Sequence, residues 1–129
     1  MKKIKSKSDK RLIVECIVNN KPANFLIDTG ASVGLIDYDQ RRDYDLAVGR
    51  SYNGTLVGAG GEIKKIKHCD TFVELVDKKI PQFLLADISH VVESIERETD
   101  ITILGIISLS QMKICGINID ANDNEIIIE

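Results

Sequence analysis

One aspartate in the sequence stands where it could do chemistry. Asp28 comes directly after the largely apolar run 23–27, and Thr29 and Gly30 follow it. A carboxylate beside buried apolar residues is costly unless hydrogen bonds or a charged partner satisfy it. The hydroxyl of Thr29 can donate and accept hydrogen bonds, and Gly30 permits an unusual turn and the close approach of another segment. These residue types predict a carboxylate held rigidly at the base of a cleft, where it could exchange protons with a bound molecule.

The elements that must position Asp28 are predicted to be short strands with little helix. Residues 11–18 form a β-rich segment, and the turn signal at 19–22 joins it to 23–27. This pattern predicts a hairpin whose second strand ends at Asp28. Further strands are expected at 33–36, 71–76, 82–86 and 101–104, with hairpins over 52–67 and 117–128, one helical turn within 37–44, and helices at 89–98 and 106–113. The sum predicts a mostly β fold, closed or sandwich-like.

Length and composition indicate one globular domain. The chain has 129 residues, of which 43% are hydrophobic and 29% charged, a composition typical of folded proteins. We expect a basic, solvated N-terminal tail at residues 1–10 and one domain at 11–129. The net charge of −3 argues against a nucleic-acid partner. No stretch of the sequence is apolar enough to cross a bilayer, so we expect no membrane partner and a cytoplasmic location.

Neither the cysteines nor the acidic residues suggest a metal site. The three cysteines are odd in number and lack the spacing of a disulfide or zinc framework, which favours buried free thiols in a reducing compartment. A nucleophilic Cys69 assisted by His68 is the alternative interpretation. Asp120, Asp123 and Glu125 offer Ca²⁺-type ligands without the spacing of a binding loop, so we interpret them as turn residues. No metal or other cofactor is expected.

Two further blocks give Asp28 a family context. A glycine-rich tip, Gly58-Ala59-Gly60-Gly61, lies between strand-like segments, and the block Ile103-Leu104-Gly105 is followed by Leu109. Together with Asp28-Thr29-Gly30-Ala31, and in this order, these blocks resemble the retropepsin family, the single-domain aspartic peptidases of retroviruses and their bacterial relatives. The resemblance spans residues 12–128. It implies a closed retropepsin-like acid-protease β-barrel with one or two short helices, one lobe per chain.

The resemblance also implies a role for each block. Asp28 would be the catalytic carboxylate, and its loop would be supported by Thr29, Gly30 and Ala31, with Thr29 bonding across a two-fold axis. The mobile flap over a bound peptide would be formed by Gly58, Ala59, Gly60 and Gly61. The residues that pack under the catalytic loop would be Ile103, Leu104 and Gly105.

A single copy of the motif implies a homodimer. The chain holds one Asp-[Thr/Ser]-Gly, whereas peptide hydrolysis of this kind needs two carboxylates, one as base and one as acid. The two would share a proton, as is known for aspartic proteases, because both cannot easily ionise. The leading hypothesis is a homodimeric aspartic endopeptidase acting on a peptide or protein substrate, with one Asp28 from each chain. The alternatives are a catalytically silent retropepsin-like module that binds peptides or dimerises, and an unrelated β-domain with a chance Asp-Thr-Gly.

The sequence departs from the retroviral pattern around the motif. Retroviral members carry Asp after the Ala and Arg after the later Gly, so that the two pair; here these positions hold Ser32 and Ile106. Ala31 lacks the hydroxyl that Ser or Thr would offer the carboxylate. Fewer hydrogen bonds to the charged form predict activity at mildly acidic to neutral pH.

Two other segments have open roles. The stretch between Gly61 and Gly105 is longer than in the viral enzymes and holds the helix expected at 89–98. This helix could cover the site, build an interface or bind something else. The apolar residues 126–128 either interleave with a partner chain or pair within their own domain.

Overall fold

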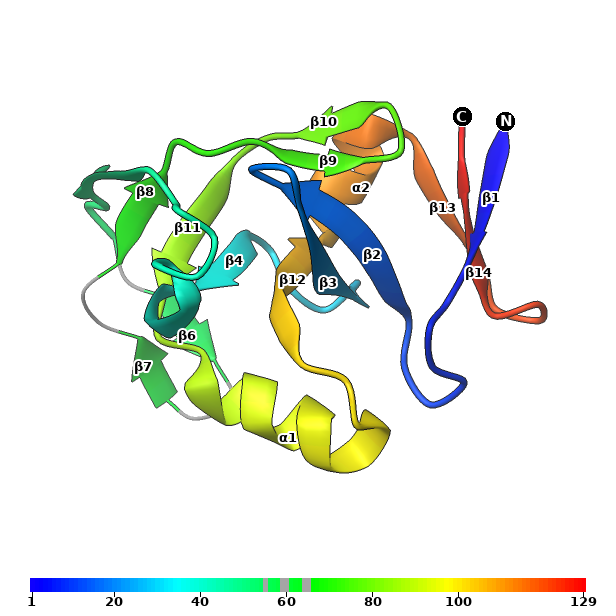
Figure 1. The fold of residues 1–129 in the computed structure, drawn as a ribbon, viewed down its shortest axis with the longest axis horizontal. Helices are drawn as coiled ribbons and strands as arrows, with labels where there is room; N and C mark the ends of the chain where they lie inside the picture. The colour runs from blue at the N-terminus through cyan, green and yellow to red at the C-terminus, as the bar shows by residue number, and fades with distance from the viewer. Residues whose placement is uncertain (55, 59–60, 64–65) are drawn as a thin grey trace.

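The computed structural model describes residues 1–54, 56–58, 61–63 and 66–129, and over these residues it shows a mostly β fold with two α-helices (Figure 1). The strands are β1 (Lys2–Lys5), β2 (Ile13–Val18), β3 (Lys21–Asp28), β4 (Gly34–Asp37), β5 (Val48–Ser51), β6 (Leu56–Gly58), β7 (Gly61–Ile63), β8 (Lys67–Cys69), β9 (Val73–Leu75), β10 (Lys78–Ile80), β11 (Phe83–Ala86), β12 (Ile103–Ser108), β13 (Ile117–Asp120) and β14 (Glu125–Ile128). The helices are α1 (Ser89–Thr99), α2 (Leu109–Cys115) and the single 3₁₀ turn η1 (Tyr38–Gln40). None of the helices in the described ranges is both long and apolar enough to cross a membrane.

Nine of the described strands form one sheet in the order β10-β9-β2-β3-β12-β4-β11-β8-β5. β2 and β3 form the predicted antiparallel hairpin, whose turn contains Asn19 and Asn20 with positive φ. β12 lies between β3 and β4, parallel to the first and antiparallel to the second. β4 in turn runs parallel to β11. The strand that ends at Asp28 is therefore flanked by strands on both sides, away from the free edges of the sheet.

β12 extends further along the chain than the sequence pattern predicts. The pattern favoured a strand at 101–104 and a helix at 106–113, whereas β12 continues to Ser108 and α2 begins one residue later. Apolar residues three apart suggested a helix, but every residue of β12 is buried, and a strand buried on both faces needs no alternation of apolar and polar residues. Gly105 permits this packing, because a Cβ there would collide with the carbonyl oxygen of Leu35 on β4.

The nine-stranded sheet is open, which corrects the expectation of a closed barrel. Within the described residues, β10 and β5 stand at opposite ends of the strand order and do not pair with each other. A barrel requires its first and last strands to be hydrogen-bonded. The remaining strands form two separate sheets, β6-β7 and β1-β14-β13, and do not bridge these two ends.

The N-terminal segment is a strand, and not the solvated tail that its lysines suggested. β1 pairs antiparallel with β14 along its whole length, and β14 pairs on its other side with β13. The two chain ends consequently lie side by side (Figure 1). The apolar residues 126–128 pair within their own chain, and their composition follows from the burial of Ile126 and Ile128 in the core.

The helices cover two hydrophobic clusters on opposite faces of the central strands. Ile27 on β3 packs in the cluster that contains Met112 of α2. Its neighbour Leu26 packs in the cluster that contains Ile95 of α1, as expected because successive side chains of a strand point to opposite faces. The predicted helix at 89–98 is thus confirmed as α1 and covers the face opposite α2. Core packing on both faces fixes β3 up to its last residue.

Candidate active site

Asp28 ends β3 and begins a tight loop. The N–H of Gly30 donates to Oδ1 of Asp28 over 2.9 Å, and the N–H of Ala31 donates to the Asp28 carbonyl oxygen over 3.2 Å. A Cβ at position 30 would lie 3.3 Å from the same Oδ1, so glycine suits the close approach of this amide to the carboxylate. Asp28 is half-buried and Thr29 is exposed. The loop therefore orients the carboxylate while the residue stays partly open to solvent.

Strands on both sides position Asp28. The parallel pairing of β3 with β12 sets Ile107 beside Ile27 and Ser108 beside Asp28. On the other side, the N–H of Ile27 donates to the carbonyl oxygen of Leu12 over 2.9 Å, which continues the pairing of β2 toward the aspartate. Because both neighbours bond along β3, the backbone that carries Asp28 cannot shift without breaking sheet hydrogen bonds.

The block Ile103-Leu104-Gly105 lies beside the middle of β3, several residues before the loop. Ile103 pairs with Asn24 and Gly105 pairs with Phe25, and all three residues of the block are buried. A Cβ at Gly105 would lie 2.8 Å from the ring of Phe25. The block thus packs against the strand that leads to Asp28, and the loop itself meets the residues that follow the block.

The residues after this block, Ser108 and Leu109, meet the Asp28 loop. Ser108 lies beside Asp28 in the strand register, and the N–H of Leu109 donates to the carbonyl oxygen of Ala31 over 3.2 Å. Sequence reasoning assigned this stretch to the interior of a helix, which hid the contact of Ser108 with the loop. The capping-box pattern, in which Ser108 is followed three residues later by Gln111, is the signal that could have located the helix start.

An ion pair between Arg11 and Glu98 lies near the Asp28 carboxylate. Nε of Arg11 donates to Oε1 of Glu98 over 2.9 Å, and Nη2 donates to Oε2 over 3.1 Å. These hydrogen bonds and the charge of Glu98 raise the pKa of Arg11, and the charge of Asp28 adds a smaller contribution. Nζ of Lys10 also donates to the carbonyl oxygen of Glu98 over 3.1 Å. The end of α1 is thereby tied to the segment beside Asp28. No local pattern predicts this pairing, because its partners are 87 residues apart.

Two of the predicted flap residues, Gly58 and Gly61, lie on the paired strands β6 and β7. Gly58 pairs with Gly61 in this two-stranded antiparallel sheet, which is separate from the nine-stranded sheet (Figure 1). Ala59 and Gly60, the predicted tip, lie outside the described residues. The two antiparallel strands of the expected hairpin are therefore present.

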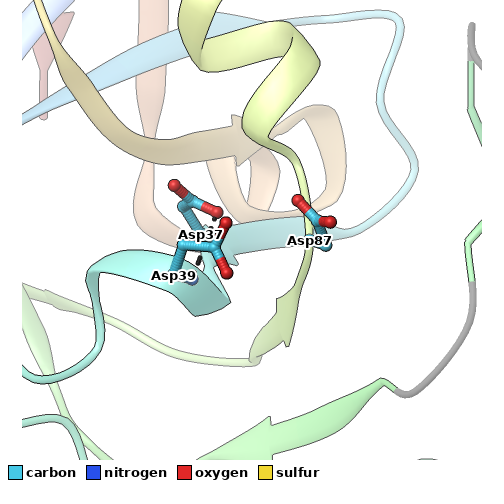
Figure 2. Close-up of side chains that lie close together, drawn as sticks. All are labelled: Asp37, Asp39 and Asp87. Carbon is cyan, nitrogen blue, oxygen red and sulfur yellow. Dashed lines mark hydrogen bonds between the residues drawn. The ribbon is translucent and has the colours of Figure 1, made fainter.

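A cluster of three aspartates lies at the end of β4, away from the Asp28 motif in the sequence (Figure 2). Carboxylate oxygens of Asp37, Asp39 and Asp87 lie within 4.8 Å of one another. The Asp37 carboxylate accepts from Nε2 of Gln40 over 3.1 Å and from the N–H of Asp39 over 3.4 Å. Burial raises the pKa of Asp37, and these hydrogen bonds partly oppose the rise. Asp37 is the N-cap of η1, so a structural role explains its burial without a bound cation.

The remaining candidate groups also have structural explanations. The N–H of Asp123 donates to Oδ1 of Asp120 over 3.2 Å, as expected for turn residues. All three cysteines are free. Burial raises the pKa of Cys16 to about 12 and raises those of Cys69 and Cys115. Protonated thiols are poor nucleophiles, so this geometry does not favour a cysteine mechanism.

Comparison with known proteins identifies the fold and the family. A family described as aspartyl protease matches residues 14–106 of this chain, and no curated protein matches it. Three solved structures are similar over most of the chain. EIAV protease, in complex with the inhibitor HBY-793, is 20% identical with a TM-score of 0.64, covering 91% of this chain and 99% of its own. A retropepsin-like aspartic protease from Rickettsia conorii is 19% identical with a TM-score of 0.62, covering 98% and 99%. The retroviral protease-like domain of Ddi1 from Leishmania major is 21% identical with a TM-score of 0.60, covering 92% and 88%.

These similarities establish a retropepsin-like fold that is mostly β with two helices. The family match covers most of the chain and contains the Asp28 loop, the β6-β7 hairpin and the start of β12. The family match includes the Asp28 motif and the end of the strand β3 that carries it. The chain belongs to the aspartyl protease family.

Proposed function

We propose that the protein is a homodimeric aspartic endopeptidase in which each chain contributes one Asp28. The observation that carries this proposal is the placement of Asp28 at the end of a central strand, half-buried, with Oδ1 held by the N–H of Gly30 at 2.9 Å. A carboxylate fixed in this way can keep a water molecule or a substrate group in line for proton transfer. Thr29 and Ala31 complete the supporting loop.

In the proposed reaction the two Asp28 carboxylates share one proton, because two adjacent negative charges repel each other. The ionised carboxylate takes a proton from a water molecule as the water oxygen bonds to the carbonyl carbon of the scissile peptide. The protonated carboxylate donates a hydrogen bond to the carbonyl oxygen as negative charge develops there. The tetrahedral intermediate then loses its C–N bond, and the leaving amine receives a proton from the dyad. Both apparent pKa values belong to the pair and not to one residue.

The requirement for a second carboxylate supports a dimer. One chain holds one Asp-Thr-Gly motif, and an isologous dimer with its axis beside Asp28 would supply the second copy. Thr29 is exposed, and Leu109, an apolar residue bonded to the loop, keeps 38% of its surface exposed. In the proposed dimer Thr29 bonds across the axis and Leu109 is covered by the partner.

In the proposed enzyme the glycine-rich block has the flap role that the family resemblance implies, and the β12 block supports the strand that leads to the catalytic loop. The flap that closes over the bound peptide would be formed by Gly58, Ala59, Gly60 and Gly61, of which Gly58 and Gly61 lie on β6 and β7. The block Ile103-Leu104-Gly105 supports β3 from the adjacent strand. We also propose activity at mildly acidic to neutral pH, since Ala31 offers no hydroxyl to the carboxylate, and a cytoplasmic location, since the cysteines are free thiols. An activity optimum at about pH 2, as expected for an aspartic protease with a strongly acidic dyad, would contradict the pH proposal.

Peptide cleavage followed by mass spectrometry tests the proposed function. A diverse peptide mixture is incubated with the protein at several pH values, with the Asp28→Asn variant in parallel, and sedimentation measures the oligomeric state. We expect cleavage by the wild type and none by the variant.

The other outcomes separate the alternatives. No cleavage from a stable dimer would replace the proposal with the silent peptide-binding or dimerisation module. A stable monomer without activity would contradict the dimer itself. Equal cleavage by the wild type and Asp28→Asn would show that Asp28 is not the catalytic residue.

A further inference from the structure

We propose that the hydroxyl of Ser110 positions the Asp28 loop, an inference that rests on the proposed function and deepens it. Oγ of Ser110 donates to the carbonyl oxygen of Ser32 over 3.0 Å. The N–H of the preceding residue, Leu109, donates to the carbonyl oxygen of Ala31 over 3.2 Å. Two successive residues at the start of α2 thus hold two successive carbonyl groups of the loop that Asp28 begins.

The Ser110 hydroxyl is itself held by buried groups. Oγ of Ser108 lies 3.0 Å from Oγ of Ser110 and 3.2 Å from Oε1 of Gln111. Ser108 and Gln111 are 0% and 1% exposed. A hydroxyl carries one proton, so Ser110, which donates to Ser32, can only accept from Ser108. The proton of Ser108 can go either to Oε1 of Gln111 or to Ser110. The Ser110 hydroxyl therefore lies between the buried Ser108 and the loop, within hydrogen-bond distance of both.

Gln111 anchors this network in the core. Its Oε1 accepts from the N–H of Ser108 over 2.9 Å, and its Nε2 donates to the carbonyl oxygen of Pro81 over 2.8 Å. A Cβ at Gly34 would collide with the Gln111 side-chain amide, so β4 packs directly against it. A buried polar network with its hydrogen bonds satisfied is rigid, because each lost bond would leave a buried group unpaired. Ser110 is the exposed end of this rigid network.

A continuous set of bonds connects this network to the carboxylate. The N–H of Ala31 donates to the Asp28 carbonyl oxygen over 3.2 Å, and the carbonyl of Ala31 is held by Leu109. If the carbonyl oxygen of Ser32 loses its hydrogen bond from Ser110, the loop beyond Ala31 loses a fixed point. The carboxylate of Asp28 then gains freedom to move. Small displacements of reacting groups reduce rates strongly, and in a dimer each of the two carboxylates would move. Ser110 contacts no reacting atom, so it is a positioning residue and not a catalytic one.

The test compares Ser110→Ala with Ser110→Thr, which keeps the hydroxyl, and with Ser94→Ala, a control at an exposed serine on α1. Steady-state kinetics on a peptide that the wild type cleaves give kcat and KM. We expect Ser110→Ala to lower kcat about tenfold, the loss of one hydrogen bond, with KM changed less than about twofold. Ser110→Thr should restore kcat, and Ser94→Ala should not change it. Thermal midpoints and sedimentation check that all variants remain folded and keep the wild-type oligomeric state.

Amide hydrogen exchange provides a readout that does not depend on activity. The amide of Ala31 should exchange faster in Ser110→Ala than in wild type, and at the wild-type rate in Ser110→Thr. Unchanged kcat and unchanged exchange in Ser110→Ala would overturn the inference, as would a kcat loss that Ser110→Thr does not restore. If the wild type cleaves no peptide, it is the proposed function that fails, and the exchange rates alone decide whether Ser110 holds the loop.

Discussion

Two aspartates end two core strands of the same sheet, and their surroundings differ. Asp28 ends β3 and Asp37 ends β4, and each of these strands is paired in parallel with a neighbour. Asp28 is half-buried and accepts from the N–H of Gly30. Asp37 is 3% exposed and accepts from Asp39 and Gln40, which follow it in η1. A strand-terminal aspartate is therefore not reactive by position alone. The residues that follow it decide whether the carboxylate caps its own chain or faces a reactant.

The same substitution at both positions gives the strongest test of this difference. Asp28→Asn removes the charge that the proposed dyad needs, and we expect kcat to fall by about 10²–10⁴-fold, the range that general acid–base groups contribute. The thermal midpoint should change little, because the asparagine side-chain oxygen can still accept from Gly30. Peptide cleavage and thermal unfolding of both variants check the expectation.

Asp37→Asn is the matched control for Asp28→Asn. It should keep kcat within about twofold of wild type, because Asp37 is a structural cap. A loss of activity in Asp37→Asn as large as that in Asp28→Asn, in a protein that remains folded, would remove the distinction between the two strand ends.

Removal of the Asp37 carboxylate should affect stability. Asp37→Ala takes away the acceptor of the Asp39 N–H and of Nε2 of Gln40. The Gln40 amide keeps its bond to the carbonyl oxygen of Ile103, so we expect a loss of about 1–3 kcal/mol in the free energy of unfolding. Denaturant unfolding measures this. Asp43→Ala, at an exposed aspartate, should change the free energy by less than about 0.5 kcal/mol. A cost at Asp37 no larger than at Asp43 would show that the cap contributes nothing.

The burial of Asp37 should also appear as a pH dependence of stability. Burial raises the folded-state pKa of Asp37 above its ordinary 3.8, so the folded state binds this proton more tightly than the unfolded state. Its contribution to stability is full below pH 3.8 and is lost as the pH rises through the folded-state value. The stability of wild type relative to Asp37→Asn should therefore fall as the pH rises above 3.8. A difference that stays flat, or that rises with pH, would contradict the raised pKa.

The sequence predicts the fold best where the structure is local. The hairpin that ends at Asp28, the helix at 89–98 and the closing hairpin over 117–128 are all present. They depend on turn residues and periodicity between near neighbours. The sequence pattern predicts a tail where β1 forms, and a strand that ends four residues before the end of β12. β1 gains its structure by pairing with β14 at the other end of the chain, a contact that no local pattern encodes.

The candidate site divides in the same way. Asp28, Thr29 and Gly30 are recognisable because the motif is contiguous and follows an apolar run. Ser108 approaches the loop only through the parallel pairing of β12 with β3, and Arg11 acquires a role only through Glu98 on α1. Both contacts join segments that are far apart in the chain, so tertiary structure was needed to find them.

Removing the ion pair between Arg11 and Glu98 should have the smallest effect on stability of the changes considered. The pair also marks a difference between the charges around Asp28 and those around Asp37. A cation lies near Asp28, whereas Asp37 has two carboxylates beside it. The Arg11 and Glu98 side chains are 50% and 35% exposed, and exposed pairs contribute little and are screened by salt. Glu98→Gln should lower the thermal midpoint slightly at low salt and not at about 1 M salt.

Acid should have the same effect as salt on this pair. The hydrogen bond from Arg11 lowers the pKa of Glu98 below 4.5, so its contribution is present above that pH and is lost as the pH falls through the folded-state value. Glu93→Gln, at an exposed glutamate of the same helix, serves as the control and should show neither dependence. A destabilisation by Glu98→Gln that persists at high salt and matches that of Asp37→Ala would mean that the pair holds α1 in place. The charged side chains near Asp28 would then be as structural as those around Asp37.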